Sequence, residues 1–179
     1  LSTLEVALDV TGTDGELPEA VHSLVEVGIL ACPTDPFDPM EKAFWELGRR
    51  TLSTTEHLHP RWEQSREYPL TPELLAVTHV WRAAPGSTLV IATKGAPEAV
   101  LDLCHLDEPT ADAWRARADE LAARGLRVLG VARSHGSVDE APSHPHDVPF
   151  EMVGLVGLED PVRADVPAAI ALCRAAGVR

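Results

Sequence analysis

The sequence predicts a domain of the α/β class, more narrowly α+β, with a mainly antiparallel sheet flanked by helices. Two observations carry this prediction. Short apolar runs of strand length include one antiparallel hairpin, and several longer segments place apolar residues at helical spacing. Hydrophobic residues make up 45% and aromatic residues 4% of the 179 residues, a composition typical of a soluble folded domain.

The N-terminal third contains one expected strand and two expected helices. Residues 4–10 largely alternate apolar and acidic side chains, as a half-buried strand does. Apolar residues at helical spacing predict a helix over residues 18–31. A second helix is expected over residues 39–51, because its Asp-Pro start supplies an N-cap and a proline at the first helical position. No element is assigned to residues 53–66.

The middle of the chain is interpreted as a hairpin followed by two helices. Residues 74–82 and 87–93 read as strands joined by an Ala-Ala-Pro-Gly turn. Helices are then expected over residues 95–106 and 109–124, and Gly125 ends the second one.

The last part of the chain is expected to form two more strands and a final helix. Strands are expected over residues 126–132 and 152–158, separated by a polar loop at residues 134–149. A final helix is expected over residues 166–176. The convincing domain boundary lies near residue 159, where Glu-Asp-Pro follows the last strand.

Charge and hydropathy exclude several classes of partner. The net charge of -13 argues against binding nucleic acid or anionic lipid, since both partners require clustered cations. An anionic ligand must therefore be held by local groups. No apolar run approaches the ~20 residues that cross a bilayer, so we expect no direct membrane contact.

Cysteine and histidine spacing indicates no metal site. Three cysteines, Cys32, Cys104 and Cys173, are widely spaced, which favours reduced thiols. Two histidine pairs, His57 with His59 and His144 with His146, are interpreted as solvated loop residues because no third ligand completes either set.

A short segment after the hairpin suits a bound phosphate or nucleotide. Residues 93–98, Thr-Lys-Gly-Ala-Pro-Glu, place Lys94 and Gly95 between a strand and a helix N-terminus. Lysine supplies a point charge, glycine permits close approach of the backbone, and the helix start offers unpaired N–H groups. The alternative is an ordinary structural turn with a solvated lysine at the strand end.

Four collinear segments resemble the nucleotide-binding (N) domain of type II P-type cation-transporting ATPases, a family of membrane pumps. They are residues 38–44 (Asp-Pro-Met-Glu-Lys-Ala-Phe), 94–98 (Lys-Gly-Ala-Pro-Glu), 125–129 (Gly-Leu-Arg-Val-Leu) and 157–163 (Gly-Leu-Glu-Asp-Pro-Val-Arg). The Arg-rich, Ala-rich composition suggests a bacterial source. Residues 169–179 resemble the helix that precedes the T-G-D loop of the phosphorylation domain in these pumps, so we expect a piece of a longer chain.

The resemblance assigns roles to individual residues. It implies that Lys94 and Gly95 line the adenine pocket and phosphate path, that Glu41 approaches the adenine amino group, and that Arg127 reaches the phosphates. Glu41 has a structural alternative, since an acid at the third helical position closes a capping box. Arg127 has one too, a salt bridge to a neighbouring helix.

The resemblance also divides the chain into an N domain over residues 1–158 and the start of a HAD-like phosphorylation domain over residues 159–179. Asp160 and Arg163 match the hinge that closes the two domains around the nucleotide. Val162 replaces the second proline of that motif.

The clearest departure from the family lies in residues 68–78, around the start of the first hairpin strand. Many relatives carry an adenine-stacking phenylalanine and a nucleotide-binding lysine there. This chain has Leu70 and Leu75. A leucine wall sandwiches a base by dispersion but lacks the stacking contribution of about 0.5–1.5 kcal/mol. We therefore expect weak binding, with Tyr68 as a substitute ring.

The function implied is ATP or ADP binding inside a cation-transporting ATPase of the bacterial inner membrane. Its partners are the phosphorylation, actuator and transmembrane domains of the same parent chain, which uses Mg²⁺ that this piece does not bind alone. No catalytic residue is expected here, because the D-K-T-G-T nucleophile motif is absent and Asp9 only mimics it. The alternative is a decayed pocket in a regulatory or interaction module, favoured by Leu70 and Leu75.

Overall fold

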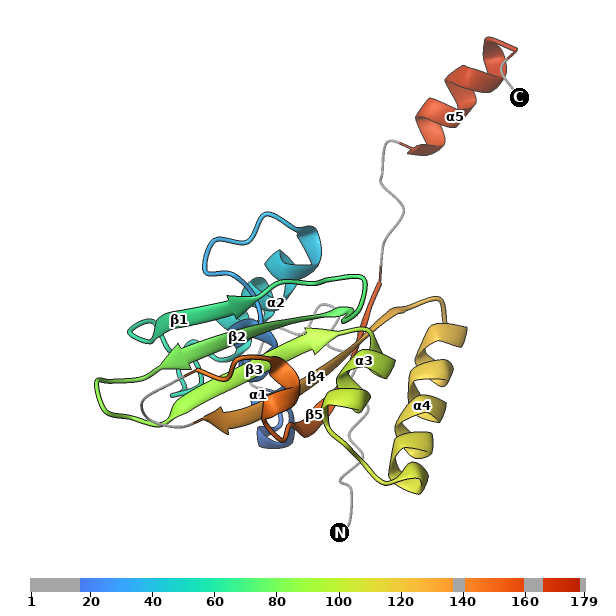
Figure 1. Ribbon diagram of the computed structural model, residues 1–179. Coiled ribbons are helices and arrows are strands. Elements are labelled where there is room, and N and C mark those ends of the chain that lie inside the picture. The colour runs from blue at the N-terminus through green and yellow to red at the C-terminus, as the bar shows by residue number, and fades with distance from the viewer. Residues whose placement is uncertain (1–16, 137–140, 160–165, 178–179) are drawn as a thin grey trace.

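The computed structural model describes residues 17–136, 141–159 and 166–177. It confirms the expected architecture, since five strands form one antiparallel sheet in sequence order (Figure 1). The strands are β1 (Glu63–Tyr68), β2 (Ala76–Arg82), β3 (Leu89–Gly95), β4 (Arg127–Gly136) and β5 (Glu151–Leu158). The strand expected over residues 4–10 lies outside the described residues.

Helices cover both faces of this sheet. One face packs against α1, on which α2 lies in turn, and the other packs against α3 and α4. Their bounds are α1 (Glu19–Leu30), α2 (Pro39–Thr51), α3 (Pro97–Leu103) and α4 (Glu108–Ala123), with a short 3-10 helix η1 (Pro145–Asp147) before β5. The expected helices are thus confirmed, within a few residues at their ends.

Strand alternation assigns each side chain to one of the two faces. Lys94 on β3 lies opposite Val77 on β2 and Val131 on β4, and directly opposed residues share a face. Val131 packs against the C-terminal turn of α1, so we call this side the α1 face. Ile91 packs with Val100 of α3 on the other side, which we call the α3 face.

Sequence reasoning missed the strand β1 and predicted that β4 ends too early. β1 lies in the segment that carried no assignment. The expected polar loop over residues 134–149 is wrong at its start, because β4 continues to Gly136. Ser134 is buried inside that extension, where its hydroxyl donates to the carbonyl of Pro149 at 2.7 Å. Because its hydroxyl has a hydrogen-bond partner, this serine can be buried in the strand without ending it.

The C-terminal helix α5 (Val166–Ala175) matches the expected bounds and buries none of its residues. Figure 1 draws it apart from the sheet. Two large apolar side chains on it, Ile170 and Leu172, are exposed. Within the three described ranges, no helix has both the length and the apolar character that a membrane crossing requires.

Candidate functional site

Lys94 is a buried, fully engaged lysine, which excludes the solvated strand-end alternative. Only 7% of the residue is exposed. Its ammonium Nζ donates to the carbonyl of Ala31 at 2.5 Å and to Oε1 of Glu41 at 2.9 Å. These contacts tie β3 to the end of α1 and to the start of α2.

The carbonyl of Ala31 is available because α1 ends there. The last carbonyls of an α-helix have no partner inside the helix and carry the negative end of its dipole. Lys94 satisfies one of them, and Trp81 on β2 satisfies its neighbour, with Nε1 donating to the carbonyl of Leu30 at 2.6 Å. The sheet therefore caps α1 through two side chains, one of them cationic.

Glu41 reaches Lys94 from the first turn of α2. Asp38 caps that helix by accepting from the backbone N–H of Met40 at 2.7 Å, and Pro39 occupies its first position. The capping-box alternative for Glu41 is not observed among the described contacts. Instead its carboxylate, with 18% of the side chain exposed, forms the ion pair with Lys94. A carboxylate near a helix N-terminus is also favoured by the helix dipole.

Two neighbours of the ion pair add no charge at neutral pH. Burial raises the pKa of Cys32 to about 11 against the opposing charge of Lys94, so this thiol stays protonated. Burial lowers the pKa of His79, although Glu67 opposes the shift, so its imidazole is neutral. The ammonium of Lys94 is thus held by the Ala31 carbonyl and the Glu41 carboxylate, with the Cys32 thiol as a further hydrogen-bonding neighbour.

Gly95 is required by close packing of backbone. A Cβ atom at this position would lie 2.3 Å from the carbonyl oxygen of Leu75 and 2.5 Å from Cα of Ala76. The same contact holds the strand end together, because the N–H of Ala96 donates to the carbonyl of Leu75 at 2.9 Å. α3 then begins at Pro97.

Leu70 and Leu75 are exposed apolar residues of the segment that joins β1 to β2. They flank a tight turn, closed by bonds of 3.1 Å from Thr71 N–H to the Leu74 carbonyl and from Leu74 N–H to the Thr71 hydroxyl. The exposed fractions are 57% for Leu70 and 44% for Leu75. Leu75 precedes Ala76, which is buried on the α3 face, so alternation points Leu75 to the α1 face with Lys94.

The structure brings Arg127 to the same face but not into contact with Lys94. Arg127 begins β4, opposite Leu158, and lies four residues before Val131, the partner of Lys94. An even spacing keeps both side chains on one face, roughly 13 Å apart along the strand. Arg127 is exposed and takes part in no ion pair within the described residues, so the structural alternative, a salt bridge to a helix, is not observed there.

Tyr68 lies on the opposite side of the sheet from Lys94. It pairs with Thr78 and packs at the edge of the α3-face core. Its hydroxyl donates to the carbonyl of Pro142, and Arg66 lies over its ring at 4.8 Å. The structure therefore does not bring this ring to the Lys94–Glu41 pair. Asp160 and Arg163, the expected hinge residues, lie outside the described residues.

Comparison of the sequence with known proteins identifies the family. The family model described as P-type ATPase, cytoplasmic domain N, matches residues 37–165. The chain belongs to this family. The match begins just before α2 and spans the whole sheet, so it includes Glu41, Lys94, Gly95 and Arg127.

Three relatives illustrate the similarity. The sodium/potassium exporting P-type ATPase cta3 of Schizosaccharomyces pombe is 36% identical over 152 residues, covering 79% of this chain and 15% of the relative. The potassium-transporting ATPase alpha chain 2 of Rattus norvegicus is 33% identical over 163 residues, covering 79% and 16%. The probable cation-transporting ATPase F of Mycobacterium bovis is 30% identical over 151 residues, with the same coverage of 79% and 16%. The chain thus spans less than a fifth of the length of these relatives.

Sequence reasoning missed one exposed residue of this N domain. Phe37 precedes the N-cap of α2 and is 92% exposed, with the ammonium of Lys42 lying 5.6 Å from its ring centroid. It lies four residues before Glu41. An aromatic residue directly before the Asp-Pro helix start is the signal that could have drawn attention to it.

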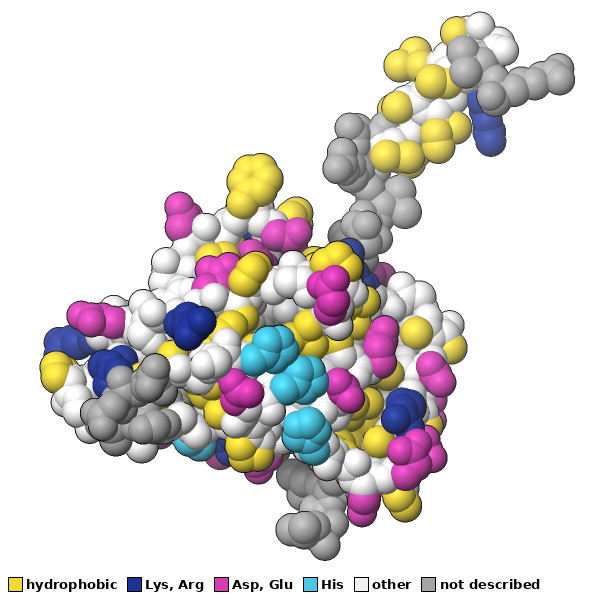
Figure 2. Space-filling view, in the orientation of Figure 1, with side chains coloured by type: hydrophobic (Ala, Val, Ile, Leu, Met, Phe, Trp, Pro, Cys, Tyr) yellow, Lys and Arg dark blue, Asp and Glu magenta, His cyan; other side chains and the backbone are white. Residues whose placement is uncertain are grey.

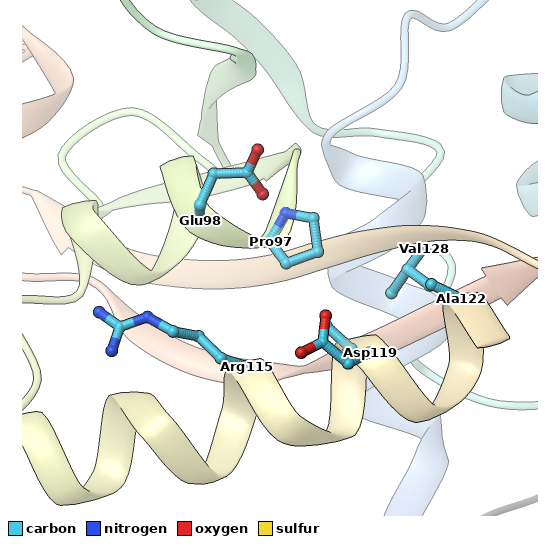
Figure 3. Close-up of a pocket in the computed structure, with 7 residues that line it drawn as sticks. Pro97, Glu98, Arg115, Asp119, Ala122 and Val128 are labelled. Carbon is cyan, nitrogen blue, oxygen red and sulfur yellow. The ribbon is translucent and has the colours of Figure 1, made fainter.

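A cavity of about 290 Å³ lies elsewhere in this N domain, between α3 and α4 (Figure 3). Pro97 and Glu98 line it from the first turn of α3, and Arg115 and Asp119 from α4. Arg115 is already paired with Glu108 and Asp112. The carboxylates of Glu98 and Asp119 disfavour a triphosphate there. Lys94 does not line this cavity, because its side chain lies on the α1 face of the sheet.

Proposed function

We propose that this N domain binds ATP at the Lys94 end of the sheet and presents it to an aspartate elsewhere in the parent protein. The observation that carries the proposal is the buried pair of Lys94 and Glu41 at the end of β3, with the exposed Leu75 at the neighbouring start of β2. An apolar wall with a few fixed polar groups is the usual make-up of a small-molecule site.

Each residue has a distinct task in this proposal. Leu70 and Leu75 offer an aliphatic surface to the adenine ring, and Lys94 supplies a positive charge near the base or the phosphates. Glu41 holds Lys94 in place and accepts from the adenine amino group. Arg127, on the same face and exposed, takes the far phosphates with its planar fork.

The parent protein is proposed to be a membrane cation-transporting ATPase that uses ATP with Mg²⁺. The N domain lies on the cytoplasmic side of a bacterial inner membrane and works with phosphorylation, actuator and transmembrane domains. Asp160 and Arg163 form the hinge to the phosphorylation domain, which residues 159–179 begin. The exposed Ile170 and Leu172 on α5 support this division, because a helix with an apolar side requires a partner to cover it.

Calorimetric titration with ATP tests the proposal and separates it from a decayed pocket. We expect weak one-to-one binding, with Kd on the order of 1 mM, or about -4 kcal/mol. ATP without Mg²⁺ should bind about as well, since no metal-binding aspartate is assigned to this domain. No heat of binding at several millimolar ATP would favour the regulatory or interaction module instead.

Replacing Leu70 by phenylalanine is expected to tighten ATP binding by about two- to twelve-fold. The new ring restores a stacking contribution of about 0.5–1.5 kcal/mol. Overpacking should be small, because Leu70 is 57% exposed. Leu172→Phe, made at an exposed leucine on α5, is the matched control and should leave Kd unchanged. An unchanged Kd in Leu70→Phe would show that this leucine does not face the base.

The domain alone is expected neither to hydrolyse ATP nor to become phosphorylated. Asp9, in the sequence Asp-Val-Thr-Gly-Thr, lacks the lysine of the nucleophile motif. Incubation with γ-labelled ATP, followed by acid precipitation, measures incorporation directly. Label that hydroxylamine releases, and that Asp9→Asn removes, would mean that Asp9 is a nucleophile after all.

A further inference from the structure

Three potential metal ligands, none of them a predicted nucleotide residue, converge at the first turns of α1. Glu19 and His22 lie three positions apart on α1, which places them on one side of the helix. His57, in the segment between α2 and β1, reaches the same point. One ligand atom from each of these residues lies within 4.8 Å of the other two. We call these three residues the α1 histidine site.

His22 is oriented as a metal ligand would be. The residue is only 6% exposed. Its Nε2 bonds to the carbonyl of Leu17 at 2.8 Å, which fixes the ring and requires the proton on that nitrogen. Its Nδ1 is buried without a hydrogen-bond partner and lies 3.0 Å from Oε2 of Glu19. A bare lone pair facing a carboxylate is unfavourable unless a cation or a proton lies between them.

His57 shows the same arrangement with the nitrogens exchanged. Its Nδ1 bonds to Oε2 of Glu26 at 2.8 Å, and its Nε2 lies 3.6 Å from Oε1 of Glu19. Metal-bound histidines usually donate their second nitrogen to a carboxylate or a backbone carbonyl. Both forms of support are present here, Glu26 for His57 and the Leu17 carbonyl for His22. Glu26 is held in turn by Nε2 of His59 at 2.5 Å.

The distances suit a small tetrahedral ion. Bonds of about 2.0–2.2 Å to nitrogen and oxygen set tetrahedral ligand atoms roughly 3.4 Å apart. Nδ1 of His22 lies 3.0 Å from Oε2 of Glu19, and Nε2 of His57 lies 3.6 Å from Oε1 of the same carboxylate, so a small rotation of this exposed side chain brings one oxygen near that value for both rings. Two imidazoles and a carboxylate are ligands that Zn²⁺ accepts, whereas Mg²⁺ and Ca²⁺ require mostly oxygen.

We propose that the α1 histidine site binds Zn²⁺, or a related divalent transition metal, through Glu19, His22 and His57. The ligand atoms are a carboxylate oxygen, Nδ1 of His22 and Nε2 of His57, with water in the fourth position. Glu26 and His59 are positioning residues. The ion ties the segment between α2 and β1 to α1, and this proposal does not depend on nucleotide binding.

A second group of histidines provides an internal control. Figure 2 shows histidine side chains gathered over the loop that holds η1. In this region the rings of His105 and His144 lie 5.9 Å and 5.3 Å from that of His146. His146 is paired with Asp102 only at 3.7 Å. No set of three ligand atoms meets within metal-binding distance there among the described residues.

Zn²⁺ titration of the untagged, EDTA-stripped protein tests the proposal. We expect one ion per chain with Kd in the micromolar range or below, and a Tm raised by about 5–10 °C at Zn²⁺ near 100 Kd. Co²⁺ should give the strong visible absorption of a tetrahedral centre. Glu19→Gln and His57→Gln should each weaken binding at least tenfold, and Glu26→Gln by about 10–100-fold.

Two further variants test whether Zn²⁺ binds outside the α1 histidine site. His146→Gln and Cys173→Ser should leave Zn²⁺ affinity unchanged, the latter because Cys173 is an exposed thiol. Circular dichroism must show each variant folded. Glu19→Gln is the safest ligand change, since this side chain is 82% exposed. Absence of binding below about 100 µM would overturn the proposal, as would equal affinity in Glu19→Gln, His57→Gln and the wild type.

Discussion

Replacing Lys94 by methionine is expected to lower the free energy of unfolding by about 3 kcal/mol and Tm by about 6–12 °C. The variant keeps the apolar stem but removes the cation between Glu41 and the carbonyl of Ala31. Both acceptors then lose a partner in a largely dry environment, which costs more than the pair contributes. We place the loss at the lower end of the range for buried pairs, because Glu41 keeps some contact with water.

Urea unfolding measures this loss, with Lys42→Met as the matched control. Lys42 is the other lysine of the chain and is exposed, so its removal should change stability by no more than about 0.5 kcal/mol. The double variant Lys94→Met with Glu41→Gln should lose less than the two single losses added together, because no charge is then left unpaired. A loss below about 1 kcal/mol in Lys94→Met would contradict the buried ion pair.

Replacing Gly95 by alanine is expected to destabilise the domain by about 3 kcal/mol. The added methyl would overlap the carbonyl oxygen of Leu75 at 2.3 Å, and backbone atoms cannot rotate away as a side chain does. The strands β2 and β3 must separate at this end, which breaks the bond from Ala96 N–H to the Leu75 carbonyl. Faster hydrogen exchange at Ala96 should accompany the loss.

Gly136→Ala is the matched control at the end of β4. A Cβ there would meet side-chain atoms only, Cδ1 of Ile91 at 3.2 Å and Cβ of Leu89 at 3.3 Å, so a change within about 1 kcal/mol is expected. If both variants prove equally stable, close approach of backbone at Gly95 is not the reason for glycine in the Lys-Gly-Ala-Pro-Glu segment.

Much of the fold could be predicted because its elements carry local signals. α2 begins at an Asp-Pro pair, and β2 and β3 are apolar runs around a Pro-Gly turn. β1 carries no such signal. All but its last residue are exposed, and as an edge strand it has one neighbour, β2. β1 forms because its backbone pairs with β2, and this pairing leaves no apolar periodicity in the sequence from which the strand could be predicted.

The candidate site was predicted as a set of residues but not as a geometry. Lys94 and Glu41 are 53 positions apart, and no local pattern indicates that they form an ion pair. From the sequence, Lys94 is predicted to contact the ligand. In the structure it also caps the C-terminal end of α1. His57 was interpreted as a solvated loop residue because its partners, Glu19 and His22, come from a distant helix. Contacts of this kind follow from topology.

The central claim is that ATP binds at the Lys94 end of the sheet, and amide NMR during an ATP titration tests it most directly. We expect saturable shift changes at Glu41, Leu75, Lys94 and Gly95, with Arg115 and Asp119 at the α3–α4 cavity nearly unmoved. Shift changes centred on that cavity, or none near Lys94 at several millimolar ATP, would contradict the claim.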